Sequence, residues 1–412
     1  MMDFIYINVG NFIYLGVQWA ISVALVRLGG FEDAGLFSLG LTVSTMFGMI
    51  ANYGLRSFQI TDVKNRFSDY TYIVSRIITI IIAFAACLVY SIVKKFDVST
   101  LLIVLIFMLY KCVEAYSDVL SAIWQKNNRM IDVGISMGIR GIANMIFFFL
   151  CFLYSHNIII AIAAMAFSSF LTLLLFDFVK TKKYLKQTQL FKRFSKADII
   201  PLLLTGMLTM LFVFSTTLFN SIPKLIVEKK CGVSLLGVFS SVFAPTVVIS
   251  TFAVGVLLPV APKLAESFIR GDRKSIFKTI SVCNLIFVAT GVAAELLSIV
   301  VGKQLFRIVY GEEIIPYFNL FYYVIIVSVL ISVVNSYSTL LIAARKLKQL
   351  LAFSGSSCVL VLIASYLIIP KYSIYGAAYA MIGVLAVQFI AESIFIFYLL
   401  KKLNPEKSKG IG

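Results

Sequence analysis

Apolar stretches of membrane-spanning length recur along almost the whole chain, with short polar connections between them. About 20 apolar residues form a helix long enough to cross the hydrocarbon core of a bilayer. Pro245 lies inside the eighth stretch and should kink its helix, because proline removes a backbone hydrogen bond. We predict an all-α membrane protein with twelve transmembrane helices, at residues 9–28, 35–55, 71–93, 99–123, 131–154, 158–179, 199–222, 234–260, 279–300, 314–343, 350–369 and 374–400.

Charged residues interrupt the fourth and fifth stretches at helical spacing. Lys111, Glu114 and Asp118 are three and four residues apart, so they share one face of a helix. A charge at the centre of a membrane helix costs roughly 2.5–3.5 kcal/mol on insertion scales. That face must therefore meet protein or water and not lipid. In the fifth stretch polar residues recur every four positions, at Asp132, Ser136, Arg140 and Asn144.

Two interpretations of these charges remain open. They could neutralise one another as buried pairs that fix the helices, Lys111 with Glu114 or Asp118 and Arg140 with Asp132. Alternatively, they line an inward-facing site for an anionic group, in which Arg140 holds phosphate oxygens bidentately and Lys111 acts as a point charge. A desolvated carboxylate can also exchange protons near neutral pH. The candidates for proton coupling are therefore Glu114, Asp118, Asp132, Glu295 and Glu392.

Further polar residues lie near the ends or on the faces of other spans. Arg76 and Arg27 could extend the cationic site or anchor their helices by reaching the interface. Asn11 and Gln18 could line a cavity or hydrogen-bond a neighbouring helix. We expect Asp177, near the end of the sixth stretch, to lie at the membrane interface. The candidates for a polar cavity lining are Asn11, Gln18, Asn144 and Asn220.

The placement of Lys and Arg predicts the orientation of the chain. With the N-terminus inside, 24 of the 36 Lys and Arg residues fall in the inside loops and the tail, and 8 fall in the outside loops. The positive-inside rule then places both termini in the cytoplasm. The net charge of +17 reflects this topology and contact with anionic lipid head groups, so we predict no nucleic-acid partner.

Composition narrows the class of protein further. The chain is 60% hydrophobic and 13% charged, about half the charge of a soluble domain, so we expect no soluble catalytic domain. We expect the first apolar stretch to be a retained span and not a cleaved signal peptide. The six cysteines form no C-x-x-C pair and His156 is the only histidine, which predicts no metal site.

The longest linker divides the spans into two sets of six. We predict an N-terminal six-helix bundle at residues 1–180, a basic cytoplasmic linker at 181–198, a C-terminal six-helix bundle at 199–400 and a cytoplasmic tail at 401–412. Six spans per half keep both halves in the same orientation, so the bundles should be related by a pseudo-two-fold axis along the membrane normal. An internal repeat supports this duplication, because Arg27, Gly30, Gly35, Phe37 and Ser38 recur 202 residues later as Lys229, Gly232, Gly237, Phe239 and Ser240.

Short motifs in both halves resemble one family of membrane proteins. The first half carries Gln18-Trp19, Arg27-Leu28-Gly29-Gly30, Gly35-x-Phe37, Leu55-Arg56, Ser117-Asp118, Gln125, Arg129-Met130 and Arg140-Gly141. The second half carries Ile222-Pro223, Gly237-x-Phe239-Ser240, Pro262-Lys263-Leu264 and Gly271-Asp272. In this order, they resemble the Wzx-type polysaccharide-repeat flippases of the multidrug/oligosaccharidyl-lipid/polysaccharide exporter superfamily.

The resemblance implies a flippase that moves an undecaprenyl-diphosphate-linked oligosaccharide repeat unit to the outer leaflet of the bacterial cytoplasmic membrane. It implies alternating access of two bundles around a cationic cavity, and no catalysis. The product would serve O-antigen, lipopolysaccharide or capsule synthesis. The expected partners are membrane lipid, a polysaccharide polymerase and a chain-length regulator. No bound cofactor is expected, although a proton or sodium gradient could drive transport.

Three alternatives stay open at this point. A cation-coupled multidrug antiporter of the same superfamily would need an acidic cavity in the first half, whereas that half also holds cations. An O-antigen polymerase would need a large outer loop, and the longest one, at residues 301–313, is short. A peptidoglycan-precursor flippase would carry spans beyond the twelve predicted here.

Overall fold

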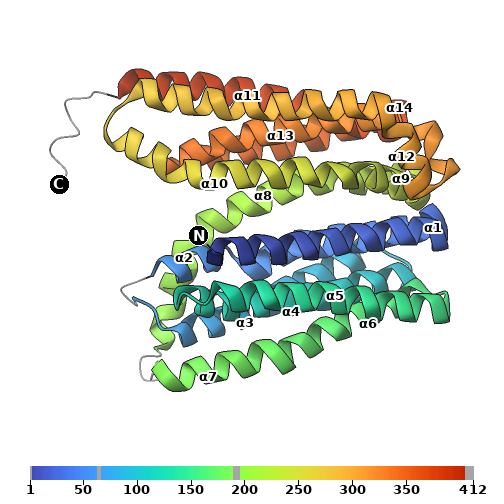
Figure 1. Cartoon of the computed structure of the whole chain (residues 1–412), viewed down its shortest axis with the longest axis horizontal. Helices are drawn as coiled ribbons and strands as arrows, with labels where there is room; N and C mark the ends of the chain where they lie inside the picture. The colour runs from blue at the N-terminus through green and yellow to red at the C-terminus, as the bar shows by residue number, and fades with distance from the viewer. Residues whose placement is uncertain (1, 63–65, 189–194, 404–412) are drawn as a thin grey trace. The chain divides into compact units, whose positions relative to one another are not determined.

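The computed structural model of the chain describes residues 2–62, 66–188 and 195–403, and for residues 2–9, 11–15 and 184–188 it describes the backbone only. Every regular element in these ranges is a helix (Figure 1). Contacts divide the chain into two compact units, Met1–Thr217 and Leu218–Gly412, called unit 1 and unit 2 below. The boundary falls inside a long helix, and the division at residues 181–198 that the sequence suggests stays a prediction.

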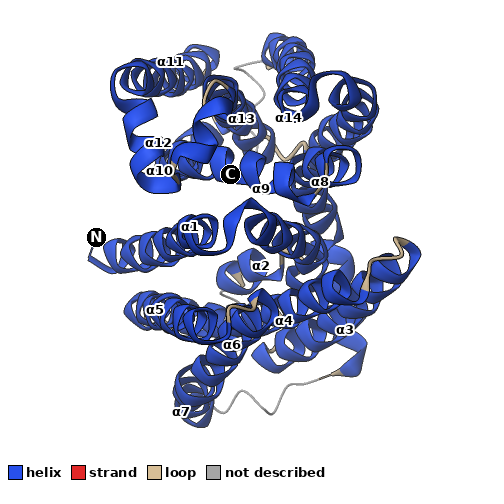
Figure 2. Cartoon of the chain, turned by 90° about the vertical axis from the view of Figure 1, so that its right-hand side faces the viewer, coloured by secondary structure: helices blue, strands red, loops and turns tan. Residues whose placement is uncertain are grey.

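Unit 1 is organised around helix α4, which packs against α1, α3 and α6 (Figure 2). Helix α1 also packs along α5. Trp124 of α4 is fully buried at the centre of an apolar cluster and donates a hydrogen bond from Nε1 to Thr181 at 3.0 Å. The elements of unit 1 are α1 (Met2–Asn52), α2 (Leu55–Thr61), α3 (Asp69–Val93), α4 (Val98–Lys126), α5 (Met130–Ser155), α6 (Ile158–Thr172), a π-helical turn (Leu173–Phe178), α7 (Val179–Thr188), a 3₁₀ turn (Lys196–Asp198) and the first part of α8 (Ile199–Cys231).

Unit 2 is organised around helix α13, which packs against α14, α10 and α11. Its core clusters join the apolar faces of α10, α11, α13 and α14 around Phe287, Val327 and Met381. The elements of unit 2 are the rest of α8, α9 (Val233–Phe243), a 3₁₀ turn (Ala244–Thr246), α10 (Val247–Ile269), α11 (Arg273–Leu297), a π-helical turn (Ser298–Gly302), α12 (Lys303–Tyr310), a 3₁₀ turn (Glu312–Tyr317), α13 (Leu320–Ala343) and α14 (Leu347–Lys402).

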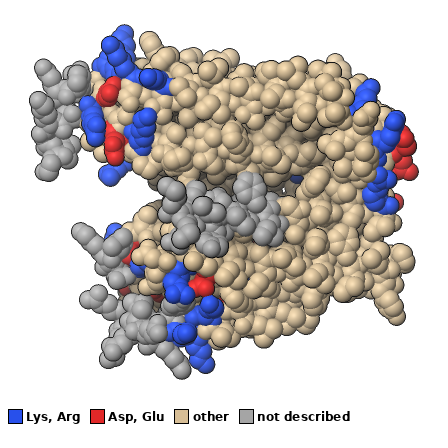
Figure 3. All heavy atoms as spheres, in the orientation of Figure 1, with Lys and Arg blue, Asp and Glu red and all other residues tan. Residues whose placement is uncertain are grey.

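Apolar side chains face outward and polar side chains face inward along α5. The polar set predicted from the sequence is buried, with Asp132, Ser136, Arg140 and Asn144 at most 7% exposed. The opposite face is apolar, with 41–47% exposure at Ile135, Ile139, Ile142 and Ile146. This arrangement suits a helix surrounded by lipid, which cannot solvate polar groups. On the face drawn in Figure 3, most of the visible charged residues gather toward the ends of the helices.

In the described residues, ten helices or helix runs are long and apolar enough to cross a membrane. Two of these helices are about twice as long as one membrane crossing needs. They are α1 with 51 residues and α14 with 56. Helix α14 contains both spans predicted there, and α1 contains the first and all but the last three residues of the second. Each helix has a break in its backbone between the two spans. The chain is therefore a multi-pass membrane protein, and the count of twelve spans stays a prediction.

The break in α14 folds the helix back on itself. Ser373 has φ 52° and ψ −138°, outside the helical region. A Cβ on Gly376 would lie 2.8 Å from the carbonyl oxygen of Ile368. Residues eight apart in a straight helix are about 12 Å apart along its axis. The segments on either side of Ser373 therefore meet at a tight turn.

The glycines of the internal repeat share one unusual backbone conformation. Gly30, inside α1, has φ 77° and ψ −175°, and Gly232, which precedes α9, has φ 94° and ψ 166°. Side chains disfavour a positive φ, so glycine suits both positions. Phe37 and Phe239, seven residues later in each copy, are both buried. The two copies thus start a helix in the same way, which supports duplication.

Two helix boundaries near α8 test the sequence predictions. The kink expected at Pro245 is confirmed, because a 3₁₀ turn at Ala244–Thr246 separates α9 from α10. The boundary predicted at residue 222 is wrong, since α8 continues to Cys231. Lys224 therefore lies inside a helix and not in an outside loop, with its ammonium 5.7 Å from the centre of the Phe243 ring.

Candidate functional site

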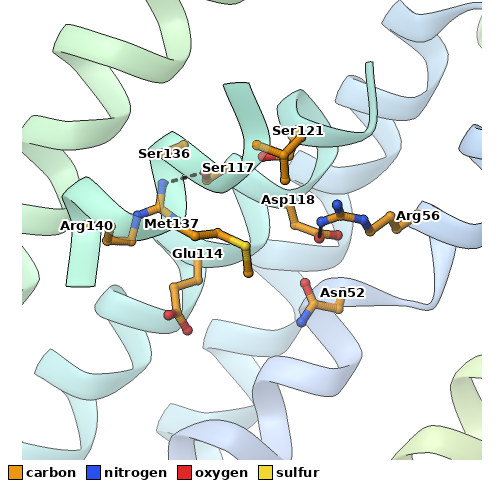
Figure 4. Close-up of a pocket in the computed structure, with 10 residues that line it drawn as sticks. Asn52, Arg56, Glu114, Ser117, Asp118, Ser121, Ser136, Met137 and Arg140 are labelled. Atoms are coloured by element: carbon orange, nitrogen blue, oxygen red, sulfur yellow. Dashed lines mark hydrogen bonds and ion pairs between the residues drawn. The ribbon is translucent and has the colours of Figure 1, made fainter. Parts of the chain in front are cut away.

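A cavity of about 170 Å³, lined mostly by polar residues, lies inside unit 1, between the end of α1, α2, α4 and α5. Figure 4 shows Arg56 beside Asp118 on one side of it and Arg140 beside Ser117 on the other. Both sides carry a guanidinium group within helices that a lipid bilayer would surround. The lining residues are Asn52, Arg56, Glu114, Ser117, Asp118, Ser121, Val133, Ser136, Met137 and Arg140.

Asp118 of α4 is held between two arginines from different helices. Arg56 of α2 donates to its Oδ1 at 2.5 Å, and Arg76 of α3 donates to its Oδ2 at 3.1 Å. Arg56 also donates to the side-chain oxygen of Gln125 at 2.9 Å, two turns further along α4. Asp118 and Gln125 are seven residues apart and so share a helix face. One carboxylate and one amide thus orient the guanidinium of Arg56 at the edge of the cavity.

Arg76 is fully buried and also closes the end of α1. Its guanidinium donates to the backbone carbonyls of Ala51 (3.0 Å) and Asn52. The last carbonyls of a helix have no partner within the helix, and a cation there also meets the negative end of the helix dipole. The interpretation of Arg76 as an anchor that reaches the interface is therefore wrong. Its side chain is 0% exposed, so it orients Asp118 without lining the cavity.

Arg140 pairs with a carboxylate that the sequence interpretation did not assign to it. Its Nη2 lies 2.5 Å from Oδ2 of Asp177, which sits in the π-helical turn after α6. Asp177 is 0% exposed, so it does not face water or lipid head groups. Its depth in the membrane stays a prediction. Ser117 and Ser136 donate to the two oxygens of Asp177 at 2.5 and 2.6 Å, and Arg140 also donates to Ser117.

Asp132 lies outside this pair. It accepts from Arg129 at 3.2 Å and from Lys180 at 2.9 Å. The pairing of Arg140 with Asp132 proposed from the sequence is therefore wrong. About two turns of α5 separate the two residues, and Arg140 pairs with Asp177 while Asp132 pairs with Arg129 and Lys180.

Lys111 and Glu114 form the pair that their spacing predicts, at 2.7 Å. The ammonium of Lys111 also lies 5.3 Å from the centre of the Tyr110 ring. Glu114 lines the cavity, whereas Lys111 reaches it through Glu114. Around the cavity, four cations (Arg56, Arg76, Lys111 and Arg140) face three carboxylates (Glu114, Asp118 and Asp177), which leaves an excess of one positive charge.

The remaining candidates of unit 1 lie apart from this cavity. Asn144 is buried one turn beyond Arg140, and its amide lies 2.7 and 2.8 Å from the hydroxyls of Ser168 and Ser169. Gln18 is partly buried and Arg27 is exposed, both on α1. The side chain of Asn11 lies outside the described residues.

Three candidates belong to unit 2. Asn220 of α8 is exposed and Glu295 of α11 is partly exposed. Glu392 of α14 is fully buried, and Gln388 donates to its Oε1 at 2.9 Å. Ser357 in turn donates to Gln388 at 2.7 Å. Within the described residues, no Lys or Arg lies within 4 Å of Glu392.

Arg56, Asn52 and Asp177 belong to the site but were not predicted from the sequence. Arg56 stood in a predicted loop, because hydropathy does not reveal that α2 returns toward α4. A signal for Asp177 was present, since a carboxylate in an apolar run is costly in a membrane and commonly pairs with a cation.

Comparison with known proteins identifies the family of this chain. The family described as polysaccharide biosynthesis protein matches residues 1–265. The chain belongs to this family. It is also 27% identical over 408 residues to the capsular polysaccharide biosynthesis protein CapF of Staphylococcus aureus, covering 97% of this chain and 99% of that protein.

Solved structures with the same fold share little of the sequence. The lipid II flippase MurJ in an inward closed conformation matches with a TM-score of 0.69 at 13% identity, over 95% of this chain and 87% of MurJ. A multidrug resistance transporter of the MATE family in an outward-facing conformation matches with a TM-score of 0.63 at 13% identity, over 97% and 94% of the two chains. The family member described here therefore has a fold like that of MurJ and the MATE transporters of the MOP superfamily.

Proposed function

We propose that this chain flips an undecaprenyl-diphosphate-linked oligosaccharide repeat unit across the bacterial cytoplasmic membrane by alternating access. The observation that carries this proposal is the cavity of unit 1, where Arg56 and Arg140 line the wall beside Glu114 and Asp118. With their ion-pair partners Arg76, Lys111 and Asp177 counted, the cluster holds one more cation than carboxylates. The planar guanidinium group binds phosphate oxygens bidentately. Membership of a polysaccharide biosynthesis family points to a sugar as the rest of the cargo.

The ion pairs suggest an order in which the cations meet the diphosphate. Arg56 is 29% exposed and shares Asp118 with Arg76, so it can turn toward a phosphate while Asp118 keeps one arginine partner. The side chain of Arg140 is 8% exposed and holds the fully buried Asp177. Breaking that pair would leave an unpaired buried charge, which is strongly unfavourable. Arg56 would therefore make the first contact with the diphosphate. Arg140 and Lys111 would attract it through their positive electrostatic potential.

Complementation of a strain that lacks its own flippase tests this proposal. Arg56→Ala and Arg140→Ala should each reduce surface polysaccharide strongly at normal expression, because a hydrogen bond to a charged group contributes about 1.5–3 kcal/mol. Arg56→Lys should restore part of the activity by charge alone. The matched control is Arg270→Ala, an exposed arginine of unit 2. Full complementation by both Arg56→Ala and Arg140→Ala would refute a cationic binding site.

Coupling to an ion gradient is a separate proposal. The carboxylates Glu114 and Asp118 line the cavity, and Glu392 is buried without a cation among the described residues. Transport into vesicles should fall when the driving gradient is collapsed. Collapsing the proton and sodium gradients one at a time identifies the ion, and indifference to both would remove these carboxylates from a coupling role.

We also propose twelve spans with both termini in the cytoplasm. The breaks at Gly30 and Ser373 support this count, because each divides an overlong helix into two segments of spanning length. Labelling of single cysteines from one side of the membrane tests it. With native cysteines replaced, Cys at Lys182 and at Lys346 should react from the cytoplasm, and Cys at Lys95 and at Lys371 from outside.

The cargo is proposed to be a capsule repeat unit, because CapF, which matches along almost the whole chain, is a capsular polysaccharide biosynthesis protein. A polysaccharide polymerase and a chain-length regulator would then act on the product. Loss of surface capsule with accumulation of lipid-linked repeat units inside the cell is the expected phenotype of a deletion. Lipid-linked units that reach the outer leaflet without polymerising would instead indicate a polymerase.

A cation-coupled multidrug antiporter is the second candidate. It is favoured by the likeness to the MATE fold and by the three carboxylates around the cavity. Expression in a strain without drug pumps distinguishes the two, since an antiporter should raise resistance to organic cations and a flippase should not.

A further inference from the structure

A groove of about 590 Å³ runs between α10 and α11 in unit 2. One wall is a single face of α10, formed by Val256, Val260 and Lys263, which are four and three residues apart. The other wall is one face of α11 from its first turn to its middle. The lining residues are Val256, Val260, Lys263, Asp272, Lys274, Ser275, Lys278, Thr279, Val282, Cys283 and Ile286.

The groove changes from charged to apolar along its length. Lys263, Lys274 and Lys278 lie close to the turn that joins the two helices, and all three are exposed. Val256 and Ile286 line the part that is further from this turn. A ligand that follows the groove would therefore meet ammonium groups at one end and hydrocarbon at the other.

The three lysines have no carboxylate partner within 4 Å among the described residues. Asp272 lines the groove, but its Oδ1 accepts from the backbone N–H of Ser275 at 3.0 Å and caps α11. Lys274 and Lys278 are four residues apart on one helix face, where like charges repel. An anion between them would relieve this repulsion.

The neighbouring arginine is directed to another part of the chain. Arg273 donates to the backbone carbonyls of Lys401 (3.1 Å) and Leu403 (2.9 Å), at the end of α14. The positive charge of the groove thus comes from the three lysines alone, and with Asp272 counted it is +2.

We propose that this groove binds one anionic phospholipid, with the phosphate of its head group at the three lysines and an acyl chain along the valines of α10 and α11. Basic pockets between membrane helices recognise anionic lipid head groups. Each lysine near the membrane surface adds a similar increment to the electrostatic attraction for these lipids. Apolar contact with an acyl chain adds binding for each buried methylene. A free anion would use only the charged half of the groove, so its shape and polarity favour a lipid.

Lipid binding to the full-length protein in detergent tests the proposal. Phosphatidylglycerol, phosphatidylcholine and inorganic phosphate are titrated separately, and retained lipid is counted by native mass spectrometry. Phosphatidylglycerol should bind at least about tenfold more tightly than phosphatidylcholine. The groove variant replaces three lysines together, Lys263→Gln, Lys274→Gln and Lys278→Gln. It should bind phosphatidylglycerol about 100-fold more weakly, because each lysine contributes about fivefold and the three factors multiply.

The matched control removes three exposed lysines that lie outside the groove, Lys95→Gln, Lys303→Gln and Lys371→Gln together. It should bind phosphatidylglycerol within about twofold of the parent protein. Val260→Trp should weaken both lipids by filling the apolar part. Equal binding of phosphatidylglycerol by the groove variant and the control would overturn the proposal. Displacement of bound phosphatidylglycerol by equimolar inorganic phosphate would assign the site to a free anion and would overturn it as well.

Discussion

Removal of the carboxylate of Asp177 is the sharpest test of how unit 1 is held together. Asp177→Ala would leave the guanidinium of Arg140 buried without its counter-ion and would leave Ser117 and Ser136 without their acceptor. Breaking a buried ion pair by removing one partner costs about 3–5 kcal/mol. Unit 1 spans Met1–Thr217, so its entropy of unfolding is about 0.45 kcal/mol/K. The melting temperature should therefore fall by roughly 7–11 °C.

The double variant Arg140→Leu with Asp177→Leu distinguishes the loss of packing from the loss of charge. Replacement of a whole buried pair by apolar residues is often neutral or stabilising, so this variant should melt within a few degrees of the parent protein. It should nevertheless fail to complement a flippase-deficient strain. Melting is followed by the loss of monodisperse protein on heating in detergent. A double variant as unstable as Asp177→Ala, or an Asp177→Ala protein that melts with the parent, would refute this reasoning.

Three further predictions concern turns and caps. Asp97 caps α4 by accepting from the backbone N–H of Thr100 at 3.1 Å, so Asp97→Ala should destabilise the protein by about 1 kcal/mol in thermal melts and Asp97→Asn by less. Hydrogen bonds from Thr100 lower the pKa of Asp97. The ionised carboxylate therefore stabilises the folded protein above the unfolded pKa of about 3.9, and this stabilisation is lost as the pH falls through the lower folded pKa. The melting temperature of the parent should fall across this pH window by more than that of Asp97→Asn. Ser373→Gly should raise the melting temperature, because Ser373 has a positive φ that glycine adopts without strain, whereas an unchanged or lower melting temperature would argue against strain there. Gly376→Ala should cost about 1–3 kcal/mol in the same melts, because its methyl group would lie 2.8 Å from the carbonyl oxygen of Ile368, and normal stability would contradict the tight turn.

The sequence predicts best those features that depend on local spacing. The polar face of α5, the pair between Lys111 and Glu114 and the interruption at Pro245 all follow from residues within one or two turns of each other. Helix periodicity determines which of these side chains can meet. Such features need no knowledge of which helices are neighbours.

The sequence does not predict which distant charges pair. Arg140 and Asp177 are 37 residues apart, and Arg56 and Asp118 are 62 apart. Asp132 lies nearer to Arg140 in the sequence and was the natural choice, yet Lys180 approaches it from the start of α7. The choice among such partners depends on how α6 and its π-helical turn pass α4 and α5, which hydropathy does not encode.

The structural and functional interpretations of the intramembrane charges are compatible. Asp118 joins α4 to α2 through Arg56 and to α3 through Arg76, which in turn holds the last carbonyls of α1. A diphosphate that attracts Arg56 would therefore weaken one of the bonds that connect these helices. The free energy of binding would then act directly on the packing of unit 1, as a ligand shifts a conformational equilibrium only through different contacts in its two states. Under the proposed function, the charges that would bind the cargo are the same charges that hold the helices together. That double role would explain why ion pairs occupy positions where leucine would cost less free energy.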